Sequence, residues 1–355
     1  MTDNPLNVHK IALIPGDGIG TEVVEAAVMV LDAASRRFGF ELETTSFPWS
    51  CETYLSDGRM MPEDGIDTLK AFDAILLGAV GWPQRVPDSV SLHGLLLPIR
   101  KSFDLYANIR PHRLLPGVVG PLRAKAFDIL CIRENTEGEY SGAGGRIHIG
   151  TPDEVAVETS VFTRRGVERI LRFGFEQARA RRGKLASVTK SNAQKHSMVF
   201  WDEVTEALAP EYPDVEVSRY HIDAIAARFV MQPKSLDVVV ASNLFGDILT
   251  DLGAAIQGGL GFAPSANVNP GADVPSMFEP VHGSAPDIAG RGIANPIATV
   301  WSGAMMLEHL GRGEAAAAIL EALGRVTTNP SLRTPDQGGS ATTAQVARGI
   351  ADLLQ

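Results

Sequence analysis

The fold is decided by the stretch Leu236-Asp-Val-Val-Val-Ala-Ser-Asn243-Leu-Phe-Gly-Asp247-Ile-Leu-Thr-Asp251. Its apolar, β-branched beginning predicts a buried strand, and Asn243 is the expected N-cap of a helix that follows. Asp247 and Asp251 would then lie one turn apart on the same face of that helix. A strand that runs directly into a helix is typical of α/β folds.

Two like charges at this spacing weaken a helix by about 0.2–0.5 kcal/mol, so we expect a cation between the carboxylates of Asp247 and Asp251. Carboxylate oxygens suit a hard divalent ion such as Mg²⁺ or Mn²⁺, which keeps positions open for water or substrate. The alternative is a solvated acidic helix start, which the helix dipole favours for Asp247.

Length and composition are typical of a globular protein with more than one core. The 355 residues exceed what a single core usually holds, so we expect two domains or lobes. Apolar residues make up 45%, and no apolar run reaches the ~20 residues that a membrane helix needs. The net charge of −10 argues against general affinity for nucleic acid or anionic membranes. An anionic substrate would therefore need a local basic cluster.

Two features bear on the cellular compartment. The N-terminal residues Met1-Thr-Asp-Asn-Pro-Leu-Asn7 lack a basic segment followed by an apolar one, so we expect no signal peptide. Cys51 and Cys131 are the only cysteines and show no motif spacing. Both features favour a reducing, cytoplasmic location.

Strand-like and helix-like segments alternate along most of the chain, which indicates an α/β architecture. The expected strands are residues 10–14, 74–78, 129–132 and 238–241. The expected helices are residues 20–38, 164–182, 304–310, 314–323 and 342–354. No segment resembles a flexible linker, so we expect the two lobes to share strands or cross-connections.

The segment Pro15-Gly16-Asp17-Gly18-Ile19-Gly20 lies between the first strand and its helix. Its glycines have the spacing G-x-G-x-G, one residue short of the G-x-G-x-x-G of a dinucleotide-binding fingerprint. A tight turn from strand to helix explains the glycines equally well. We therefore do not expect a Rossmann site here.

Three arginines lie in compact motifs: Leu96-Leu-Pro-Ile-Arg100, Tyr106-Ala-Asn-Ile-Arg110-Pro111 and Ile132-Arg133-Glu-Asn-Thr-Glu-Gly-Glu-Tyr140. Guanidinium groups bind carboxylates in bidentate geometry, so the three could hold a dicarboxylate, although each alone could be a surface ion-pair partner. Tyr140, in an expected loop, could donate a proton. Lys190 follows the short strand-like run Leu185-Ala-Ser-Val188 and could act as a base or simply be solvated.

In their order and content these segments resemble one family, the metal-dependent β-decarboxylating dehydrogenases of 2-hydroxy acids. This family includes enzymes of isopropylmalate, isocitrate, homoisocitrate, tartrate and D-malate. The resemblance runs from Ile11 to about Gly311 and also covers Tyr220-His-Ile-Asp223 and Glu279-Pro-Val-His-Gly-Ser-Ala-Pro-Asp287-Ile-Ala-Gly290. It implies oxidative decarboxylation through 2-keto and enolate intermediates that the metal stabilises.

The resemblance also implies residue roles. The substrate carboxylates would be bound by the three arginines, Arg100, Arg110 and Arg133. Mg²⁺ or Mn²⁺ would be held by three carboxylates, Asp223, Asp247 and Asp251. Lys190 would take the hydroxyl proton of the substrate, and Tyr140 would protonate the enolate. Asp223 and Lys190 would come from the neighbouring subunit of a homodimer with shared active sites; a K⁺ requirement stays open.

The fold implied by the resemblance is a two-lobed α/β sandwich with a mixed sheet spanning the lobes, not a Rossmann fold. The cofactor-binding lobe would be discontinuous, with residues 1–105 and 258–355. The second lobe, residues 106–257, would carry the metal, substrate and dimer contacts.

The implied cofactor is NAD. Asp287 stands where NADP-using relatives place a lysine followed by a tyrosine, and a carboxylate accepts hydrogen bonds from both ribose hydroxyls while repelling a 2′-phosphate. An alternative role for Asp287 is a helix N-cap. The other expected cofactor contacts are His282, Gly283, Ser284, Ala285 and Asn295.

Substrate choice depends on the segment Ser91-Leu-His93-Gly94-Leu-Leu96-Leu-Pro-Ile-Arg100. Isocitrate enzymes place serine and asparagine at the positions of Gly94 and Leu96, and isopropylmalate enzymes carry glutamate at the position of His93. Tartrate and D-malate enzymes have a bulky ring there, so His93 and Leu96 favour D-malate or tartrate. The alternatives are 3-isopropylmalate dehydrogenase and a non-catalytic regulatory subunit of the family.

Overall fold

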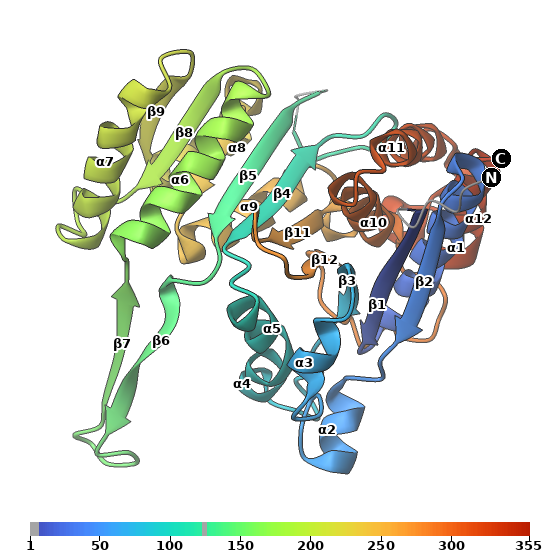
Figure 1. The fold of residues 1–355 in the computed structure, drawn as a ribbon, viewed down its shortest axis with the longest axis horizontal. Coiled ribbons are helices and arrows are strands. Elements are labelled where there is room, and N and C mark those ends of the chain that lie inside the picture. Colours follow the sequence, from blue (N-terminus) through green and yellow to red (C-terminus); the bar gives the residue numbers. More distant parts are fainter. Residues whose placement is uncertain (1–6, 123–125) are drawn as a thin grey trace. The chain divides into compact units, whose positions relative to one another are not determined.

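A computed structural model describes residues 7–122 and 126–355, and its ribbon is drawn in Figure 1. The chain forms two compact units. Unit 1 comprises Met1–Leu105, Leu114–Pro121 and Ala254–Gln355, and unit 2 comprises Tyr106–Arg113 and Leu122–Gly253. Compared with the expected lobes, this division places residues 114–121 and 254–257 in the first unit. The segment in which we expect no signal peptide lies, except for Asn7, outside the described residues.

Unit 1 is built on five strands. Their order is β2 (Glu41–Ser46), β1 (Val8–Gly16), β3 (Ala74–Ala79), β12 (Ser276–Pro280) and β11 (Pro264–Val268). The first four are parallel, and β11 runs antiparallel to β12. β3, β11 and β12 are buried along their whole length, because helices cover both faces of these strands.

Helices cover both faces of the unit 1 strands. One group packs together on one side: α1 (Gly20–Phe38), α10 (Ile297–His309), α11 (Gly313–Thr327) and α12 (Thr343–Asp352). The other group is α2 (Cys51–Asp57), α3 (Gly65–Leu69), α4 (Asp88–Ser91), the π-helix η2 (Leu92–Leu96) and α5 (Leu97–Ser102). Leu95 and Ile99 of this second group share a core with Ile14 of β1 and Leu77 of β3.

Unit 2 has a second set of five strands. Their order is β4 (Ala107–Arg113), β5 (Asp128–Glu134), β10 (Val238–Ala241), β8 (Lys184–Thr189) and β9 (Glu216–His221). β4 is antiparallel to β5, and the others are parallel. In Figure 1, α6 (Arg164–Arg179) lies in front of these strands with α7 (Ser197–Leu208) beside it, whereas α8 (Ile222–Met231) and α9 (Asn243–Ile256) lie behind. The short 3₁₀ turns of both units are η3 (Ala209–Glu211), η4 (Pro233–Ser235), η5 (Leu260–Phe262), η6 (Pro330–Leu332) and η7 (Pro335–Gln337).

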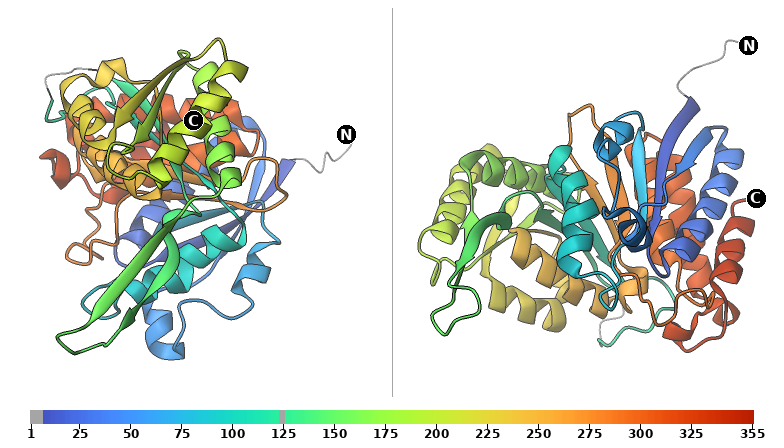
Figure 2. Two further views of the ribbon diagram at one scale, coloured as in Figure 1. Left: turned by 90° about the vertical axis from the view of Figure 1, so that its left-hand side faces the viewer. Right: turned by 90° about the horizontal axis from the view of Figure 1, so that it is seen from below.

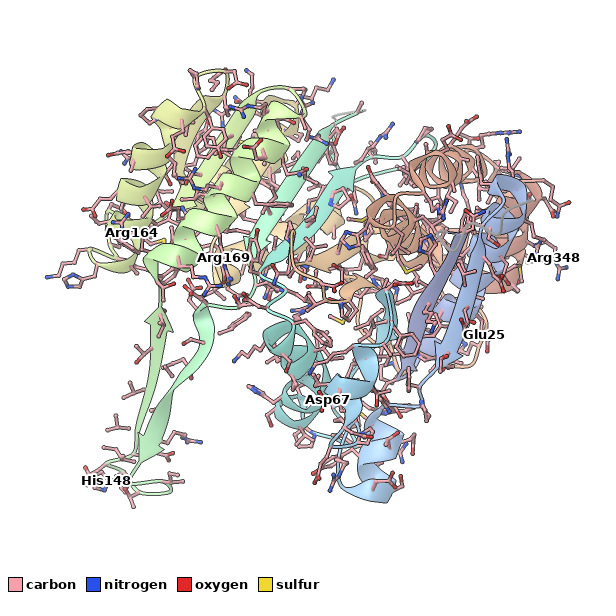
Figure 3. All side chains as sticks on the ribbon, viewed as in Figure 1. Glu25, Asp67, His148, Arg164, Arg169 and Arg348 are labelled. Atoms are coloured by element: carbon pink, nitrogen blue, oxygen red, sulfur yellow. The ribbon has the colours of Figure 1, made fainter. Side chains whose placement is uncertain are left out.

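A two-stranded arm extends from unit 2. β6 (Gly138–Ile147) pairs antiparallel with β7 (Val155–Val161), and Figures 1 and 2 show this hairpin projecting away from the other strands of the unit. His148 marks its far end in Figure 3. Every residue of β7 is exposed, and Ile149 near the tip is 68% exposed. The arm therefore presents apolar side chains that unit 2 does not cover.

The prediction of an α/β fold with a mixed sheet is confirmed. The helix at residues 20–38 has the predicted bounds, and the helix at 164–182 ends three residues earlier, at Arg179. β4 and β11 were not predicted, because buried polar residues such as Asn108, His112 and Asn267 interrupt their apolar pattern. Both cysteines are free and buried. Within the described ranges, no helix combines the length and apolar character that crossing a bilayer requires.

Candidate active site

Arg110 and Arg133 lie side by side on one face of unit 2. Arg110 pairs with Cys131 across β4 and β5, and Arg133 pairs with Asn108, so the two arginines occupy alternate positions of the same face. Helix α9 covers this face: a Cβ on Gly246 would lie 2.7 Å from the Cβ of Arg133. Both guanidinium groups are buried, so the strands and the helix fix their orientation.

Asp247 of α9 is the carboxylate that both arginines face. Arg133 Nη1 donates to Asp247 Oδ1, and Arg110 Nη1 lies 3.7 Å from the same oxygen. Arg110 Nη1 also donates to Thr250 Oγ1 at 2.6 Å. The predicted arginine cluster thus contains at least Arg110 and Arg133, and it binds a carboxylate in the structure itself.

The start of α9 differs from the prediction. Asn243 is the first residue of the helix, and its side-chain oxygen accepts from Arg133 Nε at 2.9 Å and Nη2 at 2.7 Å, so its predicted N-cap role is wrong. Glu139 of β6 supplies the cap instead, because its carboxylate accepts the Leu244 N–H at 3.1 Å and the Ser242 hydroxyl at 3.0 Å. An anionic side chain at a helix N-terminus is also favoured by the helix dipole.

Tyr140 contacts both charged partners of the cluster. It lies in strand β6, so the prediction of a loop at this residue is wrong. Its hydroxyl donates to Asp247 Oδ2 at 3.2 Å, and the Arg133 guanidinium lies 5.5 Å from its ring centroid. Desolvation, reinforced by the charge of Asp247, raises the pKa of Tyr140. The phenol therefore keeps its proton near neutral pH and can act as a proton donor.

The acidic motif between Arg133 and Tyr140 builds the backbone around the site. Glu134 accepts the N–H groups of Thr136 at 3.0 Å and Glu137 at 2.7 Å, and Glu137 accepts the Thr163 N–H at 2.8 Å. Burial raises the pKa of Glu134 to about 7, against the opposing effect of these hydrogen bonds. We did not assign roles to these glutamates from the sequence; their signal was acidic residues spaced through a polar turn.

Asp251 follows Asp247 by one helical turn, as predicted. Its pKa is raised first by desolvation and then by the charge of Asp247, while Arg110 opposes the shift. Two carboxylates whose charges disfavour each other fit a cation-binding pair. Across residues 7–122 and 126–355, no three His, Cys, Asp or Glu side chains are arranged to hold a metal. One copy of the chain therefore brings together only two of the three predicted ligands.

Asp223, the third predicted ligand, instead pairs with Lys190. Thr189 and His221 are paired at the ends of β8 and β9, so Lys190 and the start of α8 leave the same edge of the strands. Lys190 Nζ lies 2.7 Å from Asp223 Oδ1, and this hydrogen bond lowers the pKa of Asp223. The Asp223 side chain is 70% exposed and that of Lys190 is 27% exposed. This pair faces solvent and is open to another molecule.

In unit 1, Arg100 belongs to a separate buried group. Its Nη2 donates to Glu279 Oε1 at 2.6 Å, and Asn267 Nδ2 donates to the same oxygen at 2.8 Å. Glu279 was part of a quoted motif but received no role from the sequence. Leu96 lies one turn before Arg100, and His93 is exposed in the preceding π-helix η2. Single π-turns of this kind are frequent at functional sites.

The glycine-rich turn after β1 is a packing element, as its poor fingerprint indicated. Gly18 has φ +57°, and a Cβ there would lie 2.0 Å from the carbonyl oxygen of Ser284. The buried carboxylate of Asp17 accepts the N–H groups of Cys51 and Gly81, both at 2.9 Å. The turn therefore ties the loop that carries Ser284 to β1, and Gly18 has no space for a side chain.

The residues predicted to contact the cofactor lie in the loop after β12. His282 Nε2 is shielded from solvent without a hydrogen-bond partner among the described residues, and burial lowers the pKa of this ring. The exposed carboxylate of Asp287 has no partner there either, and a turn at residues 286–290 replaces the alternative helix start. The Asn295 side chain instead donates to Asp336 at 3.1 Å and accepts the Ile297 N–H at 3.1 Å. Gly283 and Ala285 lie between these groups, the latter with φ +39°.

Comparison with known proteins finds extensive similarity. Residues 10–350 match the family described as isocitrate/isopropylmalate dehydrogenase. A D-malate dehydrogenase [decarboxylating] of Escherichia coli (strain K12) is 55% identical, over 98% of this chain and 99% of the relative. A probable tartrate dehydrogenase/decarboxylase of Bacillus subtilis (strain 168) is 53% identical, over 98% of each chain. The crystal structure of isocitrate dehydrogenase from Methylococcus capsulatus has a TM-score of 0.88 and 38% identity, and covers 98% of this chain and 99% of that one.

Proposed function

Because the chain belongs to the isocitrate/isopropylmalate dehydrogenase family, we propose that it oxidises and decarboxylates a small (R)-2-hydroxy dicarboxylic acid with NAD⁺. D-malate or tartrate is the proposed substrate, as the activities named for relatives at 53–55% identity support. The observation that carries the proposal is the cluster of Arg110, Arg133 and Tyr140 around the Asp247 carboxylate. It combines carboxylate binding with a proton donor.

Substrate binding follows from the arginines. A guanidinium group that already holds the carboxylate of Asp247 has the charge and the donors to hold a substrate carboxylate. The guanidinium groups of Arg110 and Arg133 are buried, so the strands and α9 already order these side chains before a substrate binds. Arg100 would contribute a third cation from α5, with Glu279 and Asn267 fixing its orientation.

A divalent metal fits the oxygen donors of α9. Asp247 and Asp251, with Asp223 of a second copy, would hold Mg²⁺ or Mn²⁺. When bound, such an ion polarises the substrate oxygens and stabilises negative charge. We expect Asp247→Asn and Asp251→Asn each to abolish decarboxylation, while far-UV circular dichroism stays unchanged. Near-normal turnover of both variants in the presence of a chelator would refute the metal site.

Lys190 and Tyr140 would move the protons. Lys190 Nζ would take the proton of the substrate hydroxyl as the C2–H bond is oxidised. The bond from C3 to the carboxylate then breaks, CO₂ leaves, and the electron pair remains on the enolate. Tyr140 returns a proton to C3, for which its retained phenolic hydrogen is suited. Lys190 must first lose its proton, which requires Asp223 to give up their ion pair.

NAD would bind at the loop after β12. The free carboxylate of Asp287 can accept hydrogen bonds from both ribose hydroxyls and repel a 2′-phosphate. The shielded Nε2 of His282 has no hydrogen-bond partner among the described residues, and an adenosine group could supply one. Bound NAD accepts the hydride; these residues only hold and orient it.

A homodimer would complete the site. An isolated two-stranded hairpin is marginally stable in water, and the exposed valines of β7 need a covering surface, which a second arm could supply. The solvent-facing Lys190–Asp223 pair could then reach the Asp247 cluster of the other copy. Mixed and reassembled Lys190→Met and Asp247→Asn chains test this sharing. Random pairing should restore about one quarter of wild-type activity, since half the dimers carry one intact site; no recovery would place the site within one chain.

The decisive experiment for the reaction is a substrate panel. Purified protein with Mg²⁺ or Mn²⁺ should form NADH with D-malate efficiently and with tartrate detectably. Isocitrate should hardly react, because its third carboxylate would be buried without a partner. Higher catalytic efficiency with 3-isopropylmalate than with D-malate would move the chain to that branch of the family, and no NADH from any substrate would indicate a non-catalytic protein.

A further inference from the structure

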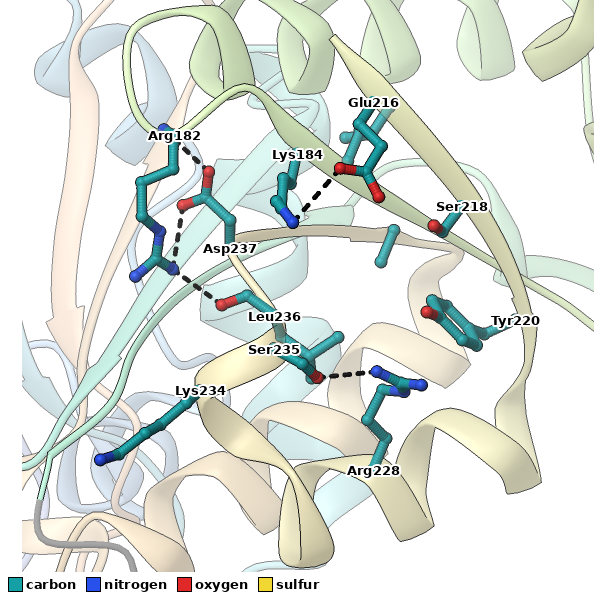
Figure 4. Close-up of a pocket in the computed structure, with 12 residues that line it drawn as sticks. Arg182, Lys184, Glu216, Ser218, Tyr220, Arg228, Lys234, Ser235, Leu236 and Asp237 are labelled. Carbon is teal, nitrogen blue, oxygen red and sulfur yellow. Dashed lines mark hydrogen bonds and ion pairs between the residues drawn. The ribbon is translucent and has the colours of Figure 1, made fainter.

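A basic cavity lies in unit 2, between strands β8 and β9, helix α8 and the turn η4. Its volume is about 270 Å³, and Figure 4 shows the side chains that line it. None of these residues belongs to the arginine cluster on β4 and β5 or to the loop after β12. The proposed function therefore assigns the cavity no role.

The charges of the cavity do not balance. Its lining holds four cationic side chains and two carboxylates, Glu216 and Asp237, which leaves a net charge of 4 − 2 = +2 in a chain whose net charge is −10. Lys184 pairs with Glu216 at 3.2 Å, and Arg182 pairs with Asp237 at 3.2 Å. The excess positive charge therefore belongs to the other two cations, Arg228 and Lys234.

Arg228 is held in place with most of its donors unused. One nitrogen, Nη1, donates to Ser235 Oγ at 2.8 Å, and the guanidinium lies 4.9 Å from the ring centroid of Tyr220. No carboxylate pairs with Arg228 anywhere in the part of the chain that the structure describes. A guanidinium has five N–H donors, so stacking on the ring fixes its plane while four donors stay available. Arg228 lies in the last turn of α8, where the helix dipole favours a cation, and this interaction uses none of its N–H donors.

Hydroxyl groups complete the lining. Ser218 and Tyr220 alternate along β9 and so face the same side, and both line the cavity with Arg228. Lys234 of η4 is exposed, and Figure 4 shows its side chain extending away from Arg228, Ser218 and Tyr220. A rigid guanidinium and two hydroxyls match the oxygens of a phosphate group, which accepts several hydrogen bonds and carries up to two negative charges.

We propose that this cavity binds the phosphate group of a small phosphorylated metabolite through Arg228, Ser218 and Tyr220. The volume leaves room beside the phosphate for a few carbon atoms, so a phosphate monoester should bind more tightly than inorganic phosphate. Lys184 and Glu216 form the wall available to the hydroxyl groups of such a ligand.

Isothermal titration calorimetry of the full chain tests the proposal in a phosphate-free chloride buffer, with inorganic phosphate and glycerol 3-phosphate as separate probes. Both lack adenine, so neither reports the adenosine part of a cofactor site. We expect both to bind the wild type and glycerol 3-phosphate to bind more tightly. Arg228→Gln should weaken both at least about tenfold, and Tyr220→Phe, which keeps the ring beside Arg228 but removes the hydroxyl, should weaken them severalfold.

Two control variants separate this cavity from other cationic groups. Arg179→Gln removes an exposed arginine of α6 that pairs with Asp214, and Arg133→Gln removes a guanidinium of the proposed active site. Both should bind the probes like the wild type. The proposal is overturned if neither probe binds at 10 mM, if Arg228→Gln binds as the wild type does, or if Arg133→Gln alone abolishes binding. Failure of the proposed reaction would leave these results unaffected.

Discussion

Stability at acid pH should depend on His112, which lies on β4 in the interior of unit 2. Neither of its ring nitrogens has a hydrogen-bond partner within residues 7–122 and 126–355, and a Cβ on Gly253 of α9 would lie 2.6 Å from the ring. Burial lowers the pKa of His112 to about 3, and the charge of Arg110 adds to the shift. The folded protein therefore holds the neutral ring at pH values where the unfolded chain takes up a proton.

The expected effect has a definite sign and size. The unfolded chain binds the proton below its ordinary pKa of 6.5, so the free energy of unfolding falls as the pH decreases from 6.5 toward 3. Between pH 7.5 and 5.0, about 1.5 pH units lie below that value, and at about 1.36 kcal/mol per unit His112 alone should cost about 2 kcal/mol. Phenylalanine keeps a planar ring but does not titrate, so His112→Phe should lose this contribution.

Urea unfolding at both pH values measures the difference. Trp201 is fully buried in unit 2, so in a background in which Trp49, Trp82 and Trp301 are replaced by phenylalanine its fluorescence reports the unit that contains His112. His148→Gln, at the exposed tip of the arm, serves as the control and should keep the wild-type pH dependence. If His112→Phe loses as much stability between pH 7.5 and 5.0 as the wild type does, the buried neutral ring is not the cause.

Three further predictions concern the proposed reaction. Lys190→Met should abolish hydride transfer, whereas Tyr140→Phe should slow enolate protonation by about 10²–10⁴-fold and slow oxidation much less. Stopped-flow measurement of NADH formation, together with product analysis, distinguishes the two effects. Formation of the wild-type products by Tyr140→Phe would contradict the acid role of Tyr140. The wild type should prefer NAD over NADP by more than about tenfold in kcat/KM, or ~1.4 kcal/mol, and the double variant Asp287→Lys, Ile288→Tyr should reverse this preference. Equal kcat/KM values of the wild type for NAD and NADP would contradict the role of Asp287. His93→Ala should raise kcat/KM for 3-alkyl malates relative to D-malate, and an unchanged ratio would remove His93 from substrate selection.

Periodic segments of the fold were predictable from the sequence, and strands with polar faces were not. α1 has its predicted bounds because Val23, Val24, Ala27, Val30 and Leu31 give a continuous apolar face. β4 carries Asn108, Arg110 and His112 on one buried face, so its pattern gives no apolar alternation. Local patterns cannot show that such polar side chains are buried, because the groups that surround them lie far away in the chain.

The candidate site shows the same division. The spacing of Asp247 and Asp251 followed from helix geometry alone, whereas the roles of the arginines came from the family resemblance. The contact of Tyr140 with Asp247 joins residues 107 positions apart, and no local pattern contains it. The cap of α9 comes from Glu139 rather than from the predicted Asn243, because strand β6 packs against a helix that is distant in the sequence.

The discontinuity of unit 1 determines the order in which a ribosome can complete the two units. β3 pairs with β12, but all of unit 2 is synthesised between them. During translation unit 2 has its full sequence at Gly253, while β3 of unit 1 still lacks its partner β12, which ends at Pro280, 27 residues later. At about 5–20 residues per second, this interval lasts about 1–5 s. Throughout it, the edge of β3 that later pairs with β12 has no partner strand.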